Sequence, residues 1–182
     1  MNTLKAEKRS MDVKAKKLRR EGFVTGNLFG REIEGSIPLK FTKKEIEVLL
    51  KNNNKGSQVM LELDGKTYDA LIKEVDYNPL AHTVEEVDFQ ALVSNEMVHS
   101  TAEIILENEE KVMSGVLQDE LKEVAYKALP ADLVDKIKVD VAGMKIGDTL
   151  RVKDLEIAKN KNIHITTDLE AVIATVTPVH NV

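Results

Sequence analysis

The sequence predicts a mainly β protein with short helices. Three observations support this class: many short segments alternate apolar and polar residues, turn-forming residues separate them, and clear helix signals are few. The chain has 182 residues, of which 42% are hydrophobic and 31% charged, a balance typical of globular domains. Short strands at this density indicate a barrel or a sandwich.

The first elements lie in the N-terminal 30 residues. Leu4–Arg9 is expected to form a strand, and Lys14–Gly22 a short helix or a basic loop that ends at Gly22. Gly22, Gly26 and Gly30 recur at intervals of four. Because charged residues follow at once, this spacing favours a close approach of backbones at a strand or bulge rather than packed membrane helices.

A strand, a helix and a hairpin come next. Ser36–Phe41 alternates apolar with polar residues, and Pro38 places this predicted strand at an edge or a bulge. Thr42 and Glu45 have the spacing of a capping box, which predicts the start of a helix. Asp64-Gly65 is a strong hairpin signal. The strands predicted around and after this turn are Gln58–Leu63, Thr67–Val75 and Thr83–Leu92.

The second half begins after a boundary near Val93–Met97, so we predict two domains, residues 1–94 and 95–182. Gly115–Ala128 is expected to be extended, although part of it would also suit a helix, and Pro130–Lys136 to form a helical turn. The other predicted strands are Val98–Leu106, Lys138–Val141, Thr149–Val152, Ile163–Thr166 and Val172–Val176.

Composition excludes several classes of protein. The chain has no cysteine, which excludes disulfide scaffolds, thiolate metal sites and cysteine nucleophiles. Its N-terminal end is charged throughout, unlike a signal peptide, and no apolar stretch approaches the ~20 residues of a membrane helix. We therefore expect a cytoplasmic protein without a membrane partner.

Charge is unevenly distributed. Residues 1–20 contain eight basic and two acidic side chains, whereas residues 96–182 contain 10 basic and 16 acidic ones. A basic leading segment before an acidic remainder is the asymmetry expected of a surface that binds a polyanion. The alternative is a solvated helix face that binds nothing, and for a charge run alone that alternative is favoured.

Catalytic signals are weak. His82, Glu85, Glu86 and Asp88 form the richest local cluster of titratable residues, which could hold a divalent ion or an acid–base pair as in a metal hydrolase. A solvated strand face is favoured, since no second set of ligands accompanies it. Gly65-Lys66-Thr67 resembles the end of a P-loop, but Met60 stands where the motif requires glycine. We expect no enzyme, no cofactor and no metal.

Nucleic-acid binding is the better class. Lysine and arginine side chains contact phosphates, and duplex RNA is recognised mainly through phosphates, 2′-hydroxyls and shape. The segment has only Phe23 and Phe29 as aromatics, which disfavours stacking on single strands. The basic residues expected to contact phosphates are Arg9, Lys16, Lys17, Arg19 and Arg20.

These residues occur in an order that resembles the family of ribosomal large-subunit protein twenty-five, also called the general stress protein Ctc family. In the first half, the resemblance rests on Ala6-Glu7-x-Arg9, Lys17–Gly22, Phe29-Gly30, Lys73-x-Val75, Asn78-Pro79 and Val87-Asp88-Phe89. In the second half, which matches the two-domain form, it rests on Ser114–Gln118, Ala128-Leu129-Pro130, Lys138–Val141, Ile146-Gly147-Asp148 and Asp154-Leu155.

The resemblance implies an N-terminal β-barrel that binds 5S ribosomal RNA in the large subunit and a C-terminal β-domain with possible protein contacts. The RNA-binding residues that it implies are Arg9, Lys14, Lys16, Lys17, Arg19, Arg20, Phe29, Lys73 and Asp88.

Three positions depart from the family pattern. Thr25 and Phe29 stand where the family usually has proline and tyrosine, and Glu86 stands where it has histidine. A carboxylate beside phosphates repels them. We therefore expect weaker RNA binding than in a typical member, or a stress-related or protein-interaction paralogue that has lost RNA binding.

Overall fold

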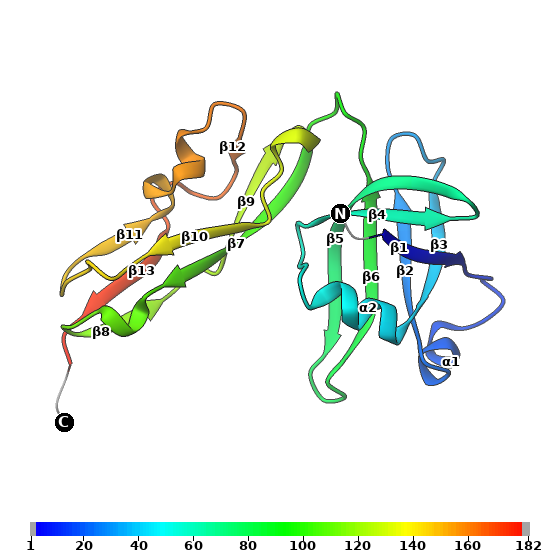
Figure 1. The fold of residues 1–182 in the computed structure, drawn as a ribbon, viewed down its shortest axis with the longest axis horizontal. Helices are drawn as coiled ribbons and strands as arrows, with labels where there is room; N and C mark the ends of the chain where they lie inside the picture. The colour runs from blue at the N-terminus through cyan, green and yellow to red at the C-terminus, as the bar shows by residue number, and fades with distance from the viewer. Residues whose placement is uncertain (1–2, 180–182) are drawn as a thin grey trace. The chain divides into compact units, whose positions relative to one another are not determined.

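A computed structural model describes residues 3–179 of the chain. It divides into two compact units, Met1–Glu96 and Met97–Val182, and each unit is described by itself. Both are built mostly of strands, and the first is a closed barrel (Figure 1). The predicted class, a mainly β protein with an N-terminal barrel and a C-terminal β-domain, is confirmed.

Six strands close the barrel in the order β1-β3-β2-β6-β5-β4. Its pairs β1–β4 and β2–β6 are parallel, and the other pairs are antiparallel. The elements of this unit are β1 (Thr3–Lys8), α1 (Ala15–Arg20), β2 (Phe23–Phe29), β3 (Ser36–Thr42), α2 (Lys43–Leu50), β4 (Gln58–Leu63), β5 (Lys66–Asn78) and β6 (Thr83–Ala91).

The barrel core comes from the side chains that point inward on alternate strand positions. Leu39 and Phe41 of β3 and Val87 and Phe89 of β6 are buried in one cluster. The rings of Phe41 and Phe89 lie 5.5 Å apart between centroids, in a tilted arrangement. Ile46 of α2 joins the same cluster, so this helix packs its apolar face on the barrel.

Two local signals in the sequence are confirmed in the barrel. Asp64 and Gly65 have φ values of 51° and 77°, the pair of positive values that a type I′ hairpin requires. The Thr42 hydroxyl accepts a hydrogen bond from the Glu45 amide at 3.3 Å, and the Glu45 carboxylate accepts one from the Thr42 amide at 3.2 Å. This capping box starts α2 where the sequence predicts a helix.

The prediction that Pro38 marks an edge or a bulge is wrong, because β3 is not an edge strand and pairs with β1 and β2 in continuous register. β3 lies between β1 and β2 inside the closed barrel. Pro38 is tolerated because β1 ends beside it: the Arg9 amide, one residue beyond β1, donates to the Pro38 carbonyl at 2.9 Å. The nitrogen of Pro38 faces the same side as its carbonyl but cannot return a hydrogen bond to the Arg9 carbonyl, and the β1–β3 ladder ends one pair earlier, at Lys8 and Leu39.

Gly26 is needed where β2 meets β6. A Cβ atom at this position would overlap the carbonyl oxygen of Val87. The close approach of backbones predicted from the glycine spacing therefore occurs at the parallel β2–β6 pair that helps to close the barrel.

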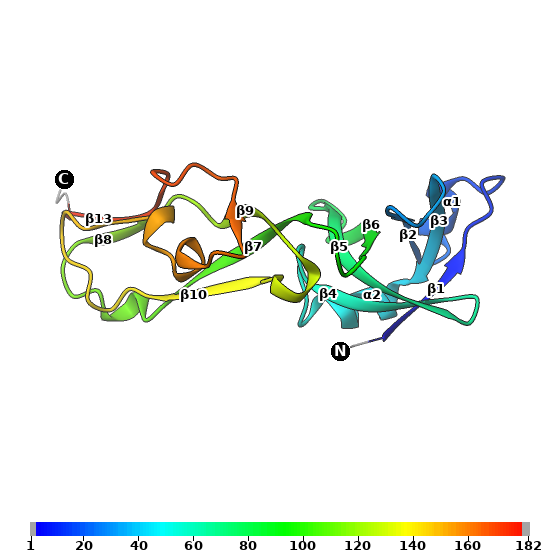
Figure 2. The ribbon, with the colours of Figure 1, turned by 90° about the horizontal axis from the view of Figure 1, so that it is seen from above.

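The second unit contains a four-stranded sheet, β10-β7-β9-β12, and a three-stranded sheet, β11-β13-β8. Figure 2 shows the two sheets as separate layers, and one apolar cluster takes residues from both. The strands are β7 (Val98–Glu107), β8 (Val116–Asp119), β9 (Glu123–Ala128), β10 (Lys136–Asp140), β11 (Thr149–Arg151), β12 (His164–Ile165) and β13 (Val172–Thr177), and the 3-10 helices are η1 (Glu109–Lys111), η2 (Pro130–Asp132), η3 (Val152–Asp154) and η4 (Glu156–Lys159).

Tyr126 anchors the segment before β10. It is fully buried, its hydroxyl donates to the Val134 carbonyl at 2.6 Å, and it accepts from the Val134 amide at 2.7 Å. Burial raises the pKa of the Tyr126 hydroxyl above its ordinary value. One side chain thus satisfies both backbone groups of a residue that lies outside the ladders.

The two 3-10 helices η3 and η4 were not anticipated by the strand pattern. Val152 of η3, Ile157 of η4 and Leu155 between the two helices are part of the core of the second unit. Gly115–Ala128, for which a helix was the alternative, is extended and forms β8 and β9.

Candidate nucleic-acid interface

Helix α1 presents most of the predicted cations. Leu18 is its buried residue, and it holds the short helix against β2. Gly22, with a φ of +90°, ends the helical segment. Since one face of a six-residue helix is used for packing, the rest lies in solvent. The exposed cations of this segment are Lys14, Lys16, Lys17 and Arg20.

Arg19 differs from these four, because its guanidinium group is bound by the barrel. Its Nε donates to the Glu85 carbonyl at 3.0 Å, and its Nη2 donates to Thr25 Oγ1 and to Glu86 Oε2, both at 3.1 Å. Nη1 lies 3.8 Å from the Glu85 carboxylate. The Arg19 side chain is only 30% exposed. This arrangement, which we call the Arg19 clamp, ties α1 to β2 and β6.

The clamp depends on the outer row of β2. Thr25 and Glu86 are direct partners in the parallel β2–β6 pair. Thr25 is fully buried beneath the guanidinium group, and its hydroxyl donates to the Glu85 carbonyl at 3.3 Å. Thr25 and Glu86, two of the three positions that depart from the family pattern, therefore both bind Arg19.

Asp88 and Phe29 lie further along the same two strands. The Asp88 carboxylate accepts a hydrogen bond from Asn27 Nδ2 at 3.1 Å. Phe29 is half-buried at the end of β2, four residues or roughly 13 Å from Thr25. These two predicted RNA contacts share the outer face that begins at the clamp.

Negative charge accompanies this face. On β5, Glu74 is paired with Asp88 and Asp76 with Glu86 across the antiparallel β5–β6 ladder. Glu74 also forms an ion pair with Lys55 at 3.2 Å. Two carboxylate pairs on neighbouring strands repel one another and any phosphate beside them. The outer face of β5 and β6 is thus acidic, and the cations concentrate on α1.

Arg9 and Lys73 lie apart from the exposed row of α1. Arg9, just beyond β1, donates from Nη2 to the Val13 carbonyl at 3.2 Å. Lys73 sits at the irregularity of β5 between Ile72 and Glu74, and burial lowers the pKa of its ammonium group. The structure therefore brings the five predicted cations from Lys14 to Arg20 together.

The acidic cluster singled out for metal or acid–base chemistry does not converge. His82 Nδ1 lies 3.2 Å from the Tyr77 hydroxyl, whereas Glu86 and Asp88 engage Arg19 and Asn27. Within residues 3–179, no three His, Asp or Glu side chains gather closely enough to hold a metal ion. In the same described range, no helix has the length and apolar character needed to cross a membrane.

The partners of Arg19 were not predicted from the sequence. Its contacts with Glu85 and Glu86 join residues 66 and 67 positions apart. A charge run shows which side chains are cationic, but the pairing of β2 with β6 decides which of them meets a carboxylate.

Comparison with known proteins agrees with this two-part fold. Residues 4–89 match the Ribosomal L25p family, and residues 97–180 match the C-terminal domain of ribosomal protein TL5. The two matches correspond to the barrel and to the second β unit. The fold and these matches define the class of protein: it is a ribosomal protein with two β domains.

Three relatives resolve the family within this class. The chain is 30% identical over 183 residues to large ribosomal subunit protein bL25 of Bacillus velezensis, covering 98% of this chain and 89% of the relative. It is 31% identical to bL25 of Akkermansia muciniphila, with 92% and 83% covered, and 32% identical to bL25 of Carboxydothermus hydrogenoformans, with 92% and 87% covered. The chain belongs to the Ribosomal L25p family.

Membership confirms three further predictions. The resemblance noted from the residues is correct, the family is non-enzymatic, and its members are components of cytoplasmic ribosomes.

Proposed function

We propose that this protein is a non-catalytic component of the large ribosomal subunit that binds 5S rRNA through helix α1 and the adjoining outer face of β2 and β6. The observation that carries the proposal is the set of exposed cations on α1 and at its N-cap, Lys14, Lys16, Lys17 and Arg20. Family membership supplies the ribosomal context.

The geometry of α1 suits a phosphate backbone. Lys14 and Arg20 are six residues apart, which is about 9 Å along a helix. Side chains at Lys16 and Arg20 lie four residues apart and share one side of the helix. Flexible cations spaced in this way match duplex RNA, in which phosphates and 2′-hydroxyls are the accessible groups.

The other predicted residues take different roles in this proposal. Asp88 accepts hydrogen bonds from base amino groups or 2′-hydroxyls, and Phe29 contacts the sugar-phosphate surface from the end of β2. Arg9 and Lys73 approach the backbone from the flanks. Arg19 is assigned a positioning role, because its guanidinium group already has its partners in the barrel.

The proposal is tested by titrating 5S rRNA with the full chain in a gel-shift assay over a salt series. Replacing Lys16 and Arg20 together by alanine is expected to flatten the log–log salt slope by about 1.4–1.8, since each phosphate contact contributes about −0.7 to −0.9. Affinity at ~0.15 M salt then falls roughly 10- to 30-fold.

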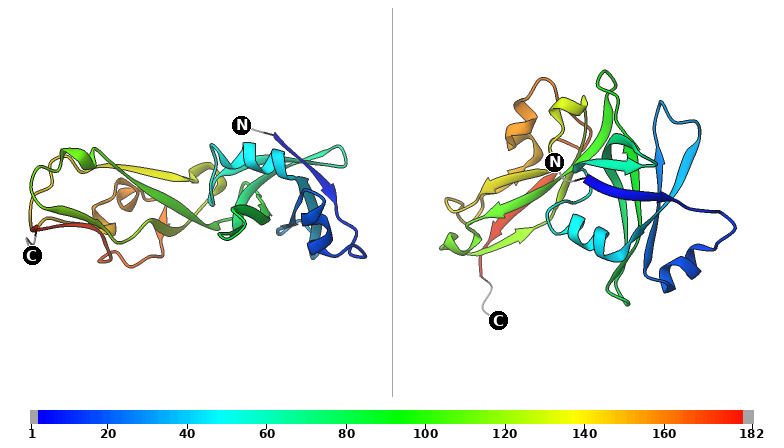
Figure 3. Two further views of the ribbon diagram at one scale, coloured as in Figure 1. Left: turned by 90° about the horizontal axis from the view of Figure 1, so that it is seen from below. Right: turned by 45° about the vertical axis from the view of Figure 1, so that its right-hand side comes forward.

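The matched control replaces Lys44 and Lys51 by alanine. Both are exposed lysines of the same unit, on or just after α2, which is separate from α1 (Figure 3). This control should leave the slope unchanged. Absence of binding at low salt, or an equal effect of both double variants, overturns the proposal.

A second candidate is a paralogue that docks proteins and has lost RNA binding. The acidic outer face of β5 and β6 and the neutralised Arg19 favour it. Co-sedimentation with large ribosomal subunits across a salt series separates the two functions. Recovery of a protein partner without subunits supports the second candidate over the first.

A further inference from the structure

Strand β10 forms an open edge of the four-stranded sheet. The sheet ends are β10 and β12, and the other sheet ends at β11 and β8. Edge strands are commonly kept too short to pair with another chain. β12, β11 and β8 have two, three and four residues, whereas β10 has five. β10 is therefore the longest edge strand of the second unit within the described residues.

The backbone groups that face outward on β10 follow from its pairing with β7. The Glu103 amide donates to the Asp135 carbonyl at 2.8 Å, and the Val141 amide donates to the Glu107 carbonyl at 3.0 Å. Residues 135 and 141 thus point their backbone groups toward β7. Since this direction alternates along a strand, the amide and carbonyl of Lys138 point to the open side.

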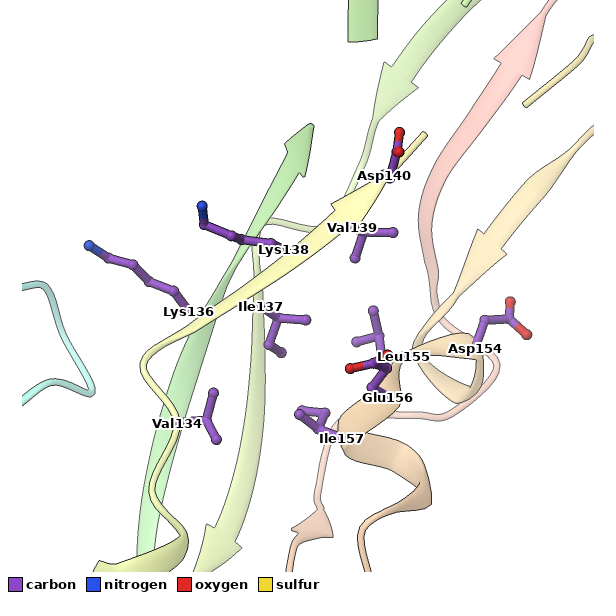
Figure 4. A pocket seen from close by; sticks show the side chains of 10 residues that line it. All are labelled: Val134, Lys136, Ile137, Lys138, Val139, Asp140, Asp154, Leu155, Glu156 and Ile157. Carbon is purple, nitrogen blue, oxygen red and sulfur yellow. The ribbon is translucent and has the colours of Figure 1, made fainter. Parts of the chain in front are cut away.

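A groove runs beside this edge, and its lining consists of five apolar and five charged residues. It has a volume of about 490 Å³. Figure 4 shows Ile137 and Val139 pointing from β10 toward Leu155 and Ile157 of the opposite wall, while the Lys138 side chain points away from the groove. A strand added to β10 would place every second side chain over this apolar floor.

The charges on the outer side define the other half of an added strand. Lys136, Lys138 and Asp140 alternate with the apolar residues of β10, and the two lysine side chains point to the opposite side of the strand from Ile137 (Figure 4). Lys138 is 66% exposed, and it forms an ion pair at 2.9 Å with Glu107 of the neighbouring strand β7. Carboxylates on the added strand would lie directly across from these lysines.

We propose that β10 binds an extended segment of another protein by strand addition, and that this segment alternates apolar and acidic residues. Main-chain hydrogen bonds to Lys138 supply part of the binding, and the groove between β10 and η4 selects apolar side chains. The five residues of β10 span about 16 Å, which matches about five residues of the added strand. This inference stands independently of the RNA proposal, because it concerns the second unit alone.

The test titrates the isotope-labelled full chain with a seven-residue peptide of alternating glutamate and valine, and follows amide hydrogen exchange by NMR. The Lys138 amide is expected to be protected at least about tenfold at saturation, since it gains a hydrogen-bond acceptor. A peptide of alternating lysine and valine should bind about tenfold more weakly, because its charges face Lys136 and Lys138.

Two variants of one residue separate the backbone from the charge. Lys138→Pro removes the outward amide without touching the β7 ladder, and should weaken binding at least about tenfold. Lys138→Ala removes the charge but keeps the amide, and should weaken binding by no more than about fivefold. Circular dichroism checks that each variant is folded.

If Lys138→Pro does not fold, protection of the Lys138 amide in the unmodified chain decides. The proposal is overturned by equal binding of both peptides, by binding without protection of that amide, or by no binding at millimolar peptide. Sedimentation tests whether the chain self-associates. Self-association that Lys138→Pro abolishes would show that β10 pairs with a second copy of this chain, and would overturn the proposed partner.

Discussion

Replacing Glu86 by glutamine tests whether the Arg19 clamp limits RNA binding. Glutamine keeps a side-chain oxygen of the same reach, so it can still accept the hydrogen bond that Arg19 donates to Glu86 at 3.1 Å. The variant removes one negative charge from the clamp while preserving its geometry. Less of the Arg19 charge is then neutralised, and we expect the guanidinium group, still held in the clamp, to attract a phosphate of 5S rRNA that lies beside it.

The size of the effect follows from counterion release. One additional phosphate contact steepens the log–log salt slope by about 0.7–0.9, which corresponds to about four- to fivefold higher affinity at ~0.15 M salt. The cost in protein stability is small: both side chains are about 30% exposed, and such a pair contributes at most ~1 kcal/mol to the free energy of unfolding.

A gel-shift salt series with 5S rRNA measures both the slope and the affinity. Glu47→Gln, the same change at an exposed residue of α2, is the control and should alter neither. The reasoning is refuted if Glu86→Gln leaves the slope unchanged or lowers the affinity in a folded protein.

Three other substitutions test the fold that carries the site. Gly26→Ala should lower the free energy of unfolding, measured in urea, by more than ~4 kcal/mol, because its Cβ overlaps a backbone carbonyl. Gly143→Ala, whose Cβ faces open space, is the control and should lower it by less than ~1 kcal/mol. A native-like urea midpoint for Gly26→Ala would contradict the barrel packing. Thr42→Ala should lose about 1 kcal/mol with the cap of α2, and Thr42→Ser almost nothing, by the same measurement. Tyr126→Phe should cost roughly 2–3 kcal/mol at neutral pH, because it leaves the amide and carbonyl of the half-buried Val134 without their partner. The raised pKa of Tyr126 means that the folded state holds this proton more tightly, so the unmodified protein should lose stability as pH rises above ~10, and a variant that declines equally there would contradict this reasoning.

Sequence motifs correctly predicted the elements that are determined by residues close together in the sequence. The Asp64-Gly65 turn needs two positive φ values, and the Thr42 cap needs an acceptor three residues away, so both are specified by neighbours in the sequence. Pro38 was predicted to lie at an edge or a bulge because proline has no amide hydrogen to donate, yet it lies inside a closed barrel, beside the residue that follows β1. Whether Pro38 can be accommodated in β3 therefore depends on where β1, a different strand, ends.

The candidate site was predictable only in part for the same reason. The exposed cations of α1 follow from the composition of one short segment. The neutralisation of Arg19 requires β6 to lie beside β2, and this contact crosses more than 60 residues. The open edge of β10 could not be predicted either, because a pattern of strands in the sequence does not show which strand lies at the end of a sheet.

The order in which the ribosome makes this chain bears on how the barrel forms. β1, which precedes the other barrel strands along the chain, pairs in parallel with β4, and β2 pairs in parallel with β6, which ends at Ala91. The β1–β4 pair cannot form before β4 has left the ribosome, and the β2–β6 pair cannot form before β6 has. Until then, β1 and β2 lack their parallel partners. The barrel can therefore close only late, when nearly all of the first unit has been synthesised. The second unit can then fold as a separate body.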